Sequence, residues 1–302
     1  MRFARTTTGL LIALFSAALP STSAAPPSAS AQSANATPQA CGTPLTAAEI
    51  DRIASLSDLS TLPATSPLER LEDEVARHEE ITEILVRQRD WRGLFSIGLD
   101  AVERAAVMPM QRDPESFGDR DWGHAISSDL LRRYLVNLHA EFTGAPVDPH
   151  WAPYFTMSRQ CEASPAEVAM AGYNAHLTVD LAYAVAAAGT EQSDVPDYYR
   201  IVDAIALEAD TIVEGTRNVY GADLGPLWSF YALGEGLDRL AGEGVASETL
   251  LRAADSGYNT VTLAHGFALQ DSRTAPAAQT SIAMLHRAVD GAIGVLSDLG
   301  GL

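Results

Sequence analysis

The chain has 302 residues, and 47% of its side chains are apolar, which is enough to bury the core of one large domain or two small ones. Its 39 acidic residues outnumber its 20 basic ones and give a net charge of -19. Binding to nucleic acid relies on basic side chains that neutralise phosphates, and a surface this acidic repels polyanions. We therefore expect no nucleic-acid partner and no docking on anionic membranes.

The N-terminus is typical of a secretion signal. Arg2 and Arg5 supply its positive charge, an apolar stretch follows over 9–19, and Ala29-Ser30-Ala31 is a cleavage pattern of small residues. The apolar stretch is too short to persist as a membrane span, and no later segment is expected to be one. The sequence predicts a secretion signal over 1–31, a flexible leader over 32–44 and a secreted helical domain over 45–302.

Two cysteines, Cys41 and Cys161, lie in the predicted mature chain. In an oxidising compartment an even pair usually forms a disulfide rather than a metal or catalytic site. We expect that bridge, and the alternative is two free thiols far apart.

Capping signals predict the first helices. Thr46 and Glu49 have the spacing of a capping box, and so do Ser66 and Glu69, with Pro67 at the first helical position. Asp90 is expected to cap the next helix, which Pro109 should end. The elements expected in this half are helices over 46–56, 67–89, 91–107 and 121–142, with loops over 109–118 and 147–155.

The second half is also expected to be helical. A helix opens at Ser164 and Pro165 and runs to about 188. Further helices are predicted over 196–220, 226–241, 247–269 and 277–299. No run of alternating β-branched residues and no hairpin turn signal occurs, so the predicted class is all-α. We expect a single multi-helix domain packed around the 164–188 helix.

This central helix carries the candidate site. Residues 169–183 are apolar nearly all round, which indicates a helix surrounded by others. His176 and Asp180 fall about 40° apart on the helical wheel. Tyr173 and Tyr183 flank the same arc and are expected to line a pocket. Buried polar groups need hydrogen-bond partners or a metal, so the pair calls for an explanation.

Three interpretations of the pair stay open. His176 and Asp180 can hold a divalent metal such as zinc, with His124 as a further ligand. Alternatively Asp180 orients His176, which acts as a general base, with Asn174 as a hydrogen-bonding neighbour. The third interpretation is a structural hydrogen bond inside a polar core.

Other histidines receive simpler interpretations. His78 lies in the charged run Arg77-His78-Glu79-Glu80 and is expected on a solvated helix face. His150 lies in a predicted loop and can line a cleft. His286 and Asp290 repeat the His-x-x-x-Asp spacing, but about one such pair is expected by chance in a chain this rich in acidic residues, so two pairs are weak evidence.

The central segment resembles the hallmark of an uncharacterised, largely actinobacterial family of unknown function. The similar residues are Gly172-x-Asn174-Ala175-His176-Leu177-x-x-Asp180-Leu181. Further stretches that look like elements of that family are Asp90 to Phe95, Asp129 to Tyr134, Trp151 to Phe155 and Asp197 to Tyr199, so the likeness covers about 70–260. Tyr173 and Ala182 depart from the family's Met and Pro. The resemblance implies a fold and the importance of Asn174, His176 and Asp180, and it implies no reaction.

A weaker analogy is to helical zinc-dependent phospholipases C, which use two His-x-x-x-Asp/Glu pairs. No mature N-terminus of this chain offers the Trp ligand of those enzymes, so their zinc geometry is not transferred. The sequence favours a secreted hydrolase, metal-dependent or not, with His176, Asp180 and Asn174 as its catalytic residues. The alternative is a non-catalytic exported protein that binds a small apolar ligand or a protein partner, with the His–Asp pair structural.

Overall fold

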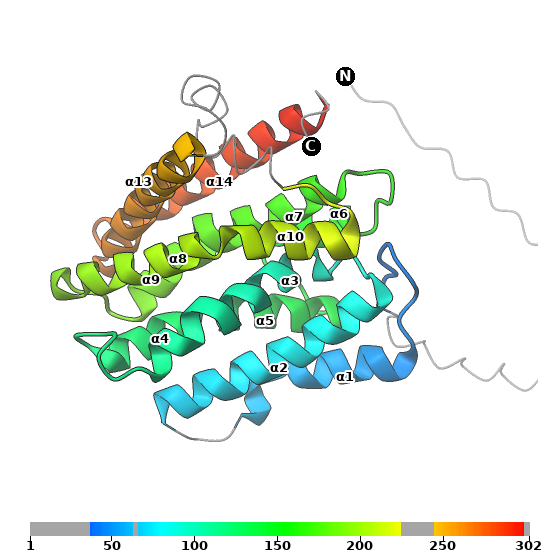
Figure 1. The fold of residues 1–302 in the computed structure, drawn as a ribbon, viewed down its shortest axis with the longest axis horizontal. Helices are drawn as coiled ribbons and strands as arrows, with labels where there is room; N and C mark the ends of the chain where they lie inside the picture. The colour runs from blue at the N-terminus through cyan, green and yellow to red at the C-terminus, as the bar shows by residue number, and fades with distance from the viewer. Residues whose placement is uncertain (1–36, 63–65, 225–244, 299–302) are drawn as a thin grey trace, which may run out of the picture. The chain divides into compact units, whose positions relative to one another are not determined.

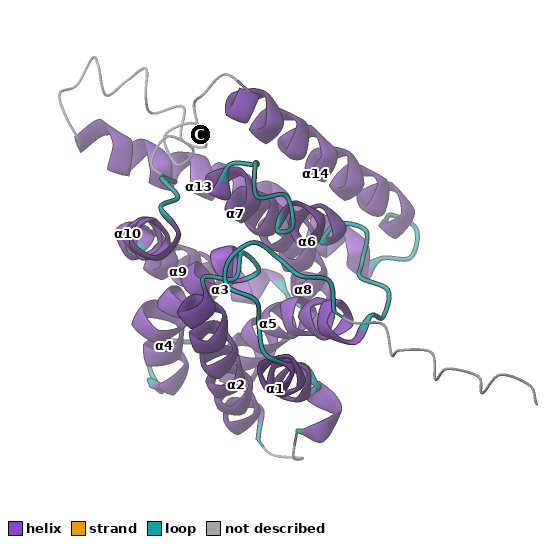
Figure 2. Ribbon diagram, turned by 90° about the vertical axis from the view of Figure 1, so that its right-hand side faces the viewer, coloured by secondary structure: helices purple, strands orange, loops and turns teal. Residues whose placement is uncertain are grey.

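The computed structural model describes residues 37–62, 66–224 and 245–298, which belong to one packed unit. Within these ranges every regular element is a helix and none is a strand (Figure 2). The predicted all-α class is therefore confirmed. Among the described helices, none is both long and apolar enough to cross a membrane.

The N-terminal helices follow their capping signals. Both predicted capping boxes are present: the Thr46 and Ser66 side chains accept the backbone N–H groups of Glu49 and Glu69, and those carboxylates reach back. Left-handed Arg89 ends the second helix with φ 48°. The resulting elements are α1 (Ala47–Ser57), η1 (Leu59–Thr61) and α2 (Pro67–Gln88).

The next helical segment departs from its prediction at Pro109. Helix α3 (Gly93–Val102) continues through a π-helical turn, η2 (Glu103–Val107), into α4 (Met108–Arg112). Pro109 lies directly after the π-helical turn, and the helix continues past it to Arg112, so the expected helix end there was wrong. The prediction that Asp90 caps this helix was also wrong. Arg92 occupies the cap position, and the Asp90 carboxylate binds the backbone N–H and the guanidinium of Arg92.

Helix α5 (Arg120–Thr143) corresponds to the helix predicted over 121–142 and ends at Gly144, which has φ 73°. The expected loop over 147–155 contains a short helix, α6 (Ala152–Met157), with Pro153 in its first turn. A long-range hydrogen bond holds this segment, since Trp151 Nε1 donates to Asp180 Oδ2 at 2.9 Å. Because that contact spans 29 residues, local sequence patterns do not predict this helix.

The predicted central helix is continuous but contains a second π-helical turn. It consists of α7 (Pro165–Asn174), η3 (Ala175–Asp180) and α8 (Leu181–Ala187), and most of its residues are buried. It packs against α3, α5, α13 and α14. A Cβ at Gly172 would lie 2.7 Å from Phe95 Cβ, so glycine allows α3 to approach closely. The central position expected from the apolar pattern is therefore confirmed.

The C-terminal helices complete the body. The predicted helix over 196–220 is interrupted at Glu208 and forms two helices, and the predicted helix over 226–241 lies outside the described residues. Helices α13 and α14 pack together and against α8 and α7, as the orange and red ribbons of Figure 1 show. The elements are η4 (Gln192–Asp194), α9 (Val195–Leu207), α10 (Ala209–Tyr220), α13 (Val245–Gln270) and α14 (Ala275–Asp298).

Residues 37–44 belong to the stretch expected as a flexible leader, and the structure gives them no helix but several anchors. The Sγ atoms of Cys41 and Cys161 lie 2.01 Å apart, so the expected pair is at disulfide distance. Cys41 N–H also donates to Ser158 O, and Trp91 N–H donates to Cys41 O. These contacts join the segment to the α2–α3 junction and to the residues after α6.

Candidate functional site: an apolar pocket beside the central helix

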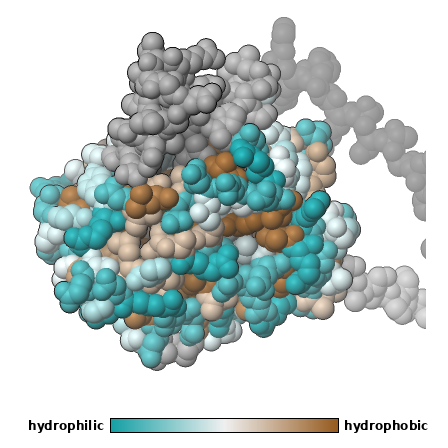
Figure 3. Space-filling model, viewed as in Figure 1, coloured by the Kyte–Doolittle hydropathy of each residue, from teal (hydrophilic) through white to brown (hydrophobic). Residues whose placement is uncertain are grey.

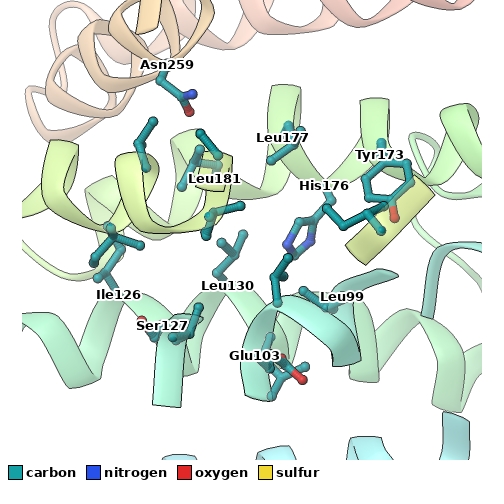
Figure 4. A pocket seen from close by; sticks show the side chains of 18 of the residues that line it. Leu99, Glu103, Ile126, Ser127, Leu130, Tyr173, His176, Leu177, Leu181 and Asn259 are labelled. Carbon is teal, nitrogen blue, oxygen red and sulfur yellow. The ribbon is translucent and has the colours of Figure 1, made fainter. Parts of the chain in front are cut away.

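A pocket of about 530 Å³ lies between the η3 segment and helices α3, α5, α9 and α10. Most of its lining is aliphatic, and among its few polar residues are Glu103, Ser127, His176 and Asn259 (Figure 4). Figure 3 shows the molecule from the same side as Figure 1. On this face hydrophobic residues form a band across the middle, with hydrophilic residues around it. The pocket has the size and composition of a typical small-molecule site.

The π-helical turn at Ala175–Asp180 sets the geometry of the central pair. A π-helical turn carries more residues than an α-helical one, so side chains four apart no longer superimpose as they do in an α-helix. His176 Nδ1 lies 4.0 Å from Asp180 Oδ2, which is too far for a hydrogen bond. The structure thus separates two groups that an α-helical spacing brings together.

Asp180 bonds to residues that precede α6. His150 Nε2 lies 2.8 Å from Asp180 Oδ1, and Trp151 Nε1 donates to Asp180 Oδ2 at 2.9 Å. The carboxylate is 2% exposed, so these partners replace the water that it loses on burial. Asp180 therefore ties the segment at α6 to the centre of the fold.

His176 is left without such partners. Its imidazole projects from η3 toward the helix that carries Leu99 (Figure 4), and its ring centre lies 5.0 Å from that of Phe95. Its Nδ1 is buried and has no hydrogen-bond partner among the described residues. Burial lowers the pKa of His176 to about 4; nearby Asp180 opposes this shift, and His78 and His150 add to it. The ring is thus neutral at pH 7.

Asn174 faces the other side of the central helix and binds α14. Its Nδ2 donates to Asp290 Oδ1 at 2.7 Å and to His286 O at 2.9 Å, and its Oδ1 accepts from Thr178 Oγ1 at 2.6 Å. His286 Nδ1 lies 3.5 Å from Asp290 Oδ2. Asn174 therefore joins the second His-x-x-x-Asp pair, on α14, to the central helix. It is not part of the pocket lining.

The structure places the remaining predicted residues in different surroundings. Tyr173 lines the pocket, whereas Tyr183 lies outside the lining, with the Arg133 guanidinium 5.4 Å from its ring centre. His124 Nε2 lies 3.1 Å from Gln111 O. Among the described residues, His124 does not join His176 and Asp180 in a group of converging metal ligands. The catalytic and metal roles of these residues remain predictions.

Sequence reasoning missed a second cluster beside the same pocket. His78 is 0% exposed, so the expectation of a solvated position was wrong. Its Nδ1 lies 2.7 Å from Glu103 Oε2, and its Nε2 lies 2.9 Å from Ser96 Oγ. Burial raises the pKa of Glu103, which also lines the pocket. The helical period of α2 could have predicted the burial of His78, because His78 shares one face with other buried residues. These are Leu71, Val75, Thr82 and Leu85.

Several stretches that carried the family resemblance build the pocket's surroundings. Asp90 and Arg92 form a buried ion pair at 2.6 Å, with the Arg92 guanidinium 4.2 Å above the Phe142 ring. Phe95 packs edge-on against Tyr134, Trp151, Tyr154 and Tyr173. These residues fix the start of α3 against the central helix and so position the pocket wall.

Residues 71–262 match the model of a family described as "Family of unknown function (DUF5995)". The match covers more than half of the chain, so this protein belongs to that family of unknown function. All pocket-lining residues, from Leu71 to Asn259, fall within the matched range. No curated protein and no solved structure matches the chain. The expected membership of an uncharacterised family is confirmed, and the detailed motif remains a prediction.

Proposed function

We propose that this member of the family binds a small, largely apolar molecule in its helix-lined pocket and that His176 holds the molecule's polar group. The observation that carries the proposal is a neutral, unpartnered imidazole on the wall of an aliphatic pocket of about 530 Å³. Burying a polar group without a partner is unfavourable, and a ligand that supplies the partner recovers that free energy.

The pocket's charge restricts the ligand. Glu103 and Asp210 contribute the ionisable acidic groups of the lining, and no Lys or Arg lines it. A neutral imidazole offers one N–H donor and one lone-pair acceptor to an occupant of the pocket. A neutral molecule with a hydroxyl group, which both donates and accepts a hydrogen bond, therefore fits better than a carboxylate.

Fluorescence titration with N-phenyl-1-naphthylamine, displaced by dodecanol or by dodecanoate, tests pocket binding. Ala206→Phe fills the pocket from α9 and is expected to weaken binding of the probe at least tenfold. Ala204→Phe is the matched control, because Ala204 lies on the same helix outside the lining. Equal probe affinity in both variants would contradict the proposal.

A second titration examines the role of His176. We expect His176→Leu to retain the naphthylamine probe and to bind dodecanol about fivefold more weakly, since one hydrogen bond is lost. The parent should also prefer dodecanol to dodecanoate at pH 7. If dodecanoate binds better, the polar contact is made by another group.

Hydrolysis is a second candidate, because His176 lines the pocket and Asp180 Oδ2 lies 4.0 Å from its Nδ1. A pKa of about 4 makes His176 a weak base at neutral pH, so binding accounts better for its surroundings. p-Nitrophenyl esters of graded chain length, with or without added zinc, test this candidate. Turnover by the parent that His176→Leu abolishes would establish it.

We also infer that the protein is exported. The predicted signal over 1–31 supports this, and so does the pair Cys41 and Cys161 at disulfide distance, because disulfides persist in oxidising compartments. Intact mass analysis of protein from the culture medium is expected to show loss of the first 31 residues and two hydrogens fewer than the reduced chain. A full-length, reduced chain inside the cell would contradict export.

A further inference from the structure

We propose that His78, Asp100 and Glu103 bind a divalent transition-metal ion in the wall of the pocket. The proposal goes beyond ligand binding and does not depend on it. Each residue offers one ligand atom, and these atoms lie within 4.8 Å of one another. Asp100 and Glu103 lie three residues apart on the continuous α3–η2 helix, and the tertiary fold brings His78 of α2 to them.

The cluster is preorganised and shielded from water. The exposed fractions of His78, Asp100 and Glu103 are 0%, 5% and 4%. His78 Nδ1 and Glu103 Oε2 are 2.7 Å apart, somewhat closer than the separation of about 3.4 Å between two ligand atoms that share a tetrahedral ion at about 2.1 Å. A small outward movement of either side chain admits the ion between them.

The imidazole of His78 is oriented as in a metal site. Its Nε2 lies 2.9 Å from Ser96 Oγ, which lies 2.7 Å from Thr82 Oγ1. Metal-binding histidines usually bond their second ring nitrogen in this way, which fixes the ring and directs the other nitrogen at the ion. Here Nδ1 is the nitrogen directed at the carboxylates, and it lies 2.7 Å from Glu103 Oε2.

Asp100 supplies an independent observation. Its side chain is 7% exposed, and its Oδ1 is buried without a hydrogen-bond partner among the described residues. Its other oxygen, Oδ2, lies 2.7 Å from Arg104 Nη2. Buried carboxylate oxygens are rarely left without a partner, and a bound cation supplies one.

The donor set indicates the kind of ion. One imidazole nitrogen and two carboxylate oxygens suit zinc or manganese rather than calcium or magnesium, which prefer oxygen alone. Three protein ligands leave at least one coordination position open. Because Glu103 also lines the pocket, that open position is available to water or to the polar group of an occupant.

Calorimetric titration of chelator-treated protein with zinc chloride, and separately with manganese chloride, tests the site. The parent is expected to bind one equivalent of at least one of these ions, and Asp100→Asn to bind it at least tenfold more weakly. Glu79→Gln is the matched control, because Glu79 contacts the same Arg104 at 3.2 Å and belongs to no ligand set. His78→Gln provides a second ligand variant in case one fails to fold, which circular dichroism reports.

Several outcomes would overturn the site: no binding by a folded parent, equal binding by parent and Asp100→Asn, or many weak equivalents typical of an acidic surface. A cobalt titration gives a second readout, since a d–d absorption band in the parent should disappear in His78→Gln. Naphthylamine binding by Asp100→Asn separates the two proposals. Retained probe with lost metal leaves the pocket intact. In the parent, metal binding without probe binding refutes only pocket binding, and probe binding without metal binding refutes only the metal site.

Discussion

Two histidine–carboxylate pairs flank the pocket, and they differ in how far their polar groups are satisfied. His78 and Glu103 come from different helices and lie 2.7 Å apart, and the second nitrogen of His78 is also bonded. His176 and Asp180 lie on one helix and are 4.0 Å apart. Each pair adjoins a π-helical turn, since η2 begins at Glu103 and η3 ends at Asp180.

The difference shows that a spacing of four residues along a helix does not by itself make two side chains hydrogen-bond to each other. Both oxygens of Asp180 are bonded to His150 and Trp151, so the His176 imidazole remains available to hydrogen-bond a ligand. Both ring nitrogens of His78, by contrast, already have hydrogen-bond partners inside the fold. In the metal-free protein we therefore assign stability to the first pair and ligand recognition to the second, and substitutions can separate these roles.

The largest expected effect follows from removing each histidine. In metal-free protein, His78→Leu should lower the free energy of unfolding by about 4 kcal/mol, because it leaves a buried carboxylate without its partner. His176→Leu should change it by less than about 1 kcal/mol, since it removes an unpaired polar group. Urea denaturation measures both. Similar losses in the two variants would erase the distinction between the pairs.

Acid sensitivity sharpens the comparison. The pKa of His176 is about 4 in the folded protein against an ordinary value of 6.5, so the unfolded chain takes up the proton first as pH falls. The free energy of unfolding should therefore decrease between pH 6.5 and pH 4, by about 3 kcal/mol from this group, and no further below that. Urea denaturation across this range should show a shallower pH dependence in His176→Leu. Parallel curves for parent and variant would mean that another group governs the dependence.

A smaller effect is expected at Asp180. Asp180→Asn keeps an acceptor for Trp151 Nε1 and removes the charge beside His150, so we expect a loss of about 2 kcal/mol. Thermal unfolding at pH 7 measures it. Probe binding in the pocket should persist, because neither partner of Asp180 lines it. Loss of the probe without loss of stability would place Asp180 in the binding site.

The smallest effect is the coupling within each pair. A double-mutant cycle of His78→Leu and Glu103→Gln should give a coupling energy of about 1–2 kcal/mol, because the two side chains share a buried hydrogen bond. The cycle of His176→Leu and Asp180→Asn should give less than about 0.5 kcal/mol. Stronger coupling in the second cycle would indicate that Asp180 closes onto His176 in solution.

Much of the fold is predictable because its signals are local. The capping boxes at Thr46 and Ser66 start their helices as expected, and the apolar run around residues 169–183 correctly marks the central helix. The π-helical turns, the passage through Pro109 and the break at Glu208 depend on packing between helices. A single sequence carries little trace of such contacts.

The candidate site is predictable to the same extent. His176 lies on a buried helix in a run of apolar residues, and both its burial and its place at a pocket follow. Asp180 cannot be assigned, because His150 and Trp151 reach it from a segment about 30 residues away. His78 was hidden by charged neighbours, although it occupies a buried position in the helical period of α2.

The central claim is that His176 is a neutral group that meets a ligand in the pocket. Nitrogen-15 NMR of histidine-labelled protein at pH 7 tests it most directly, with His176→Leu identifying the signal. The account predicts a neutral imidazole with a ring-nitrogen signal that shifts on addition of dodecanol, whereas His139, bonded to Ala54 O outside the pocket lining, does not respond. A charged imidazole at pH 7, or an unchanged signal at saturating dodecanol, would contradict the account.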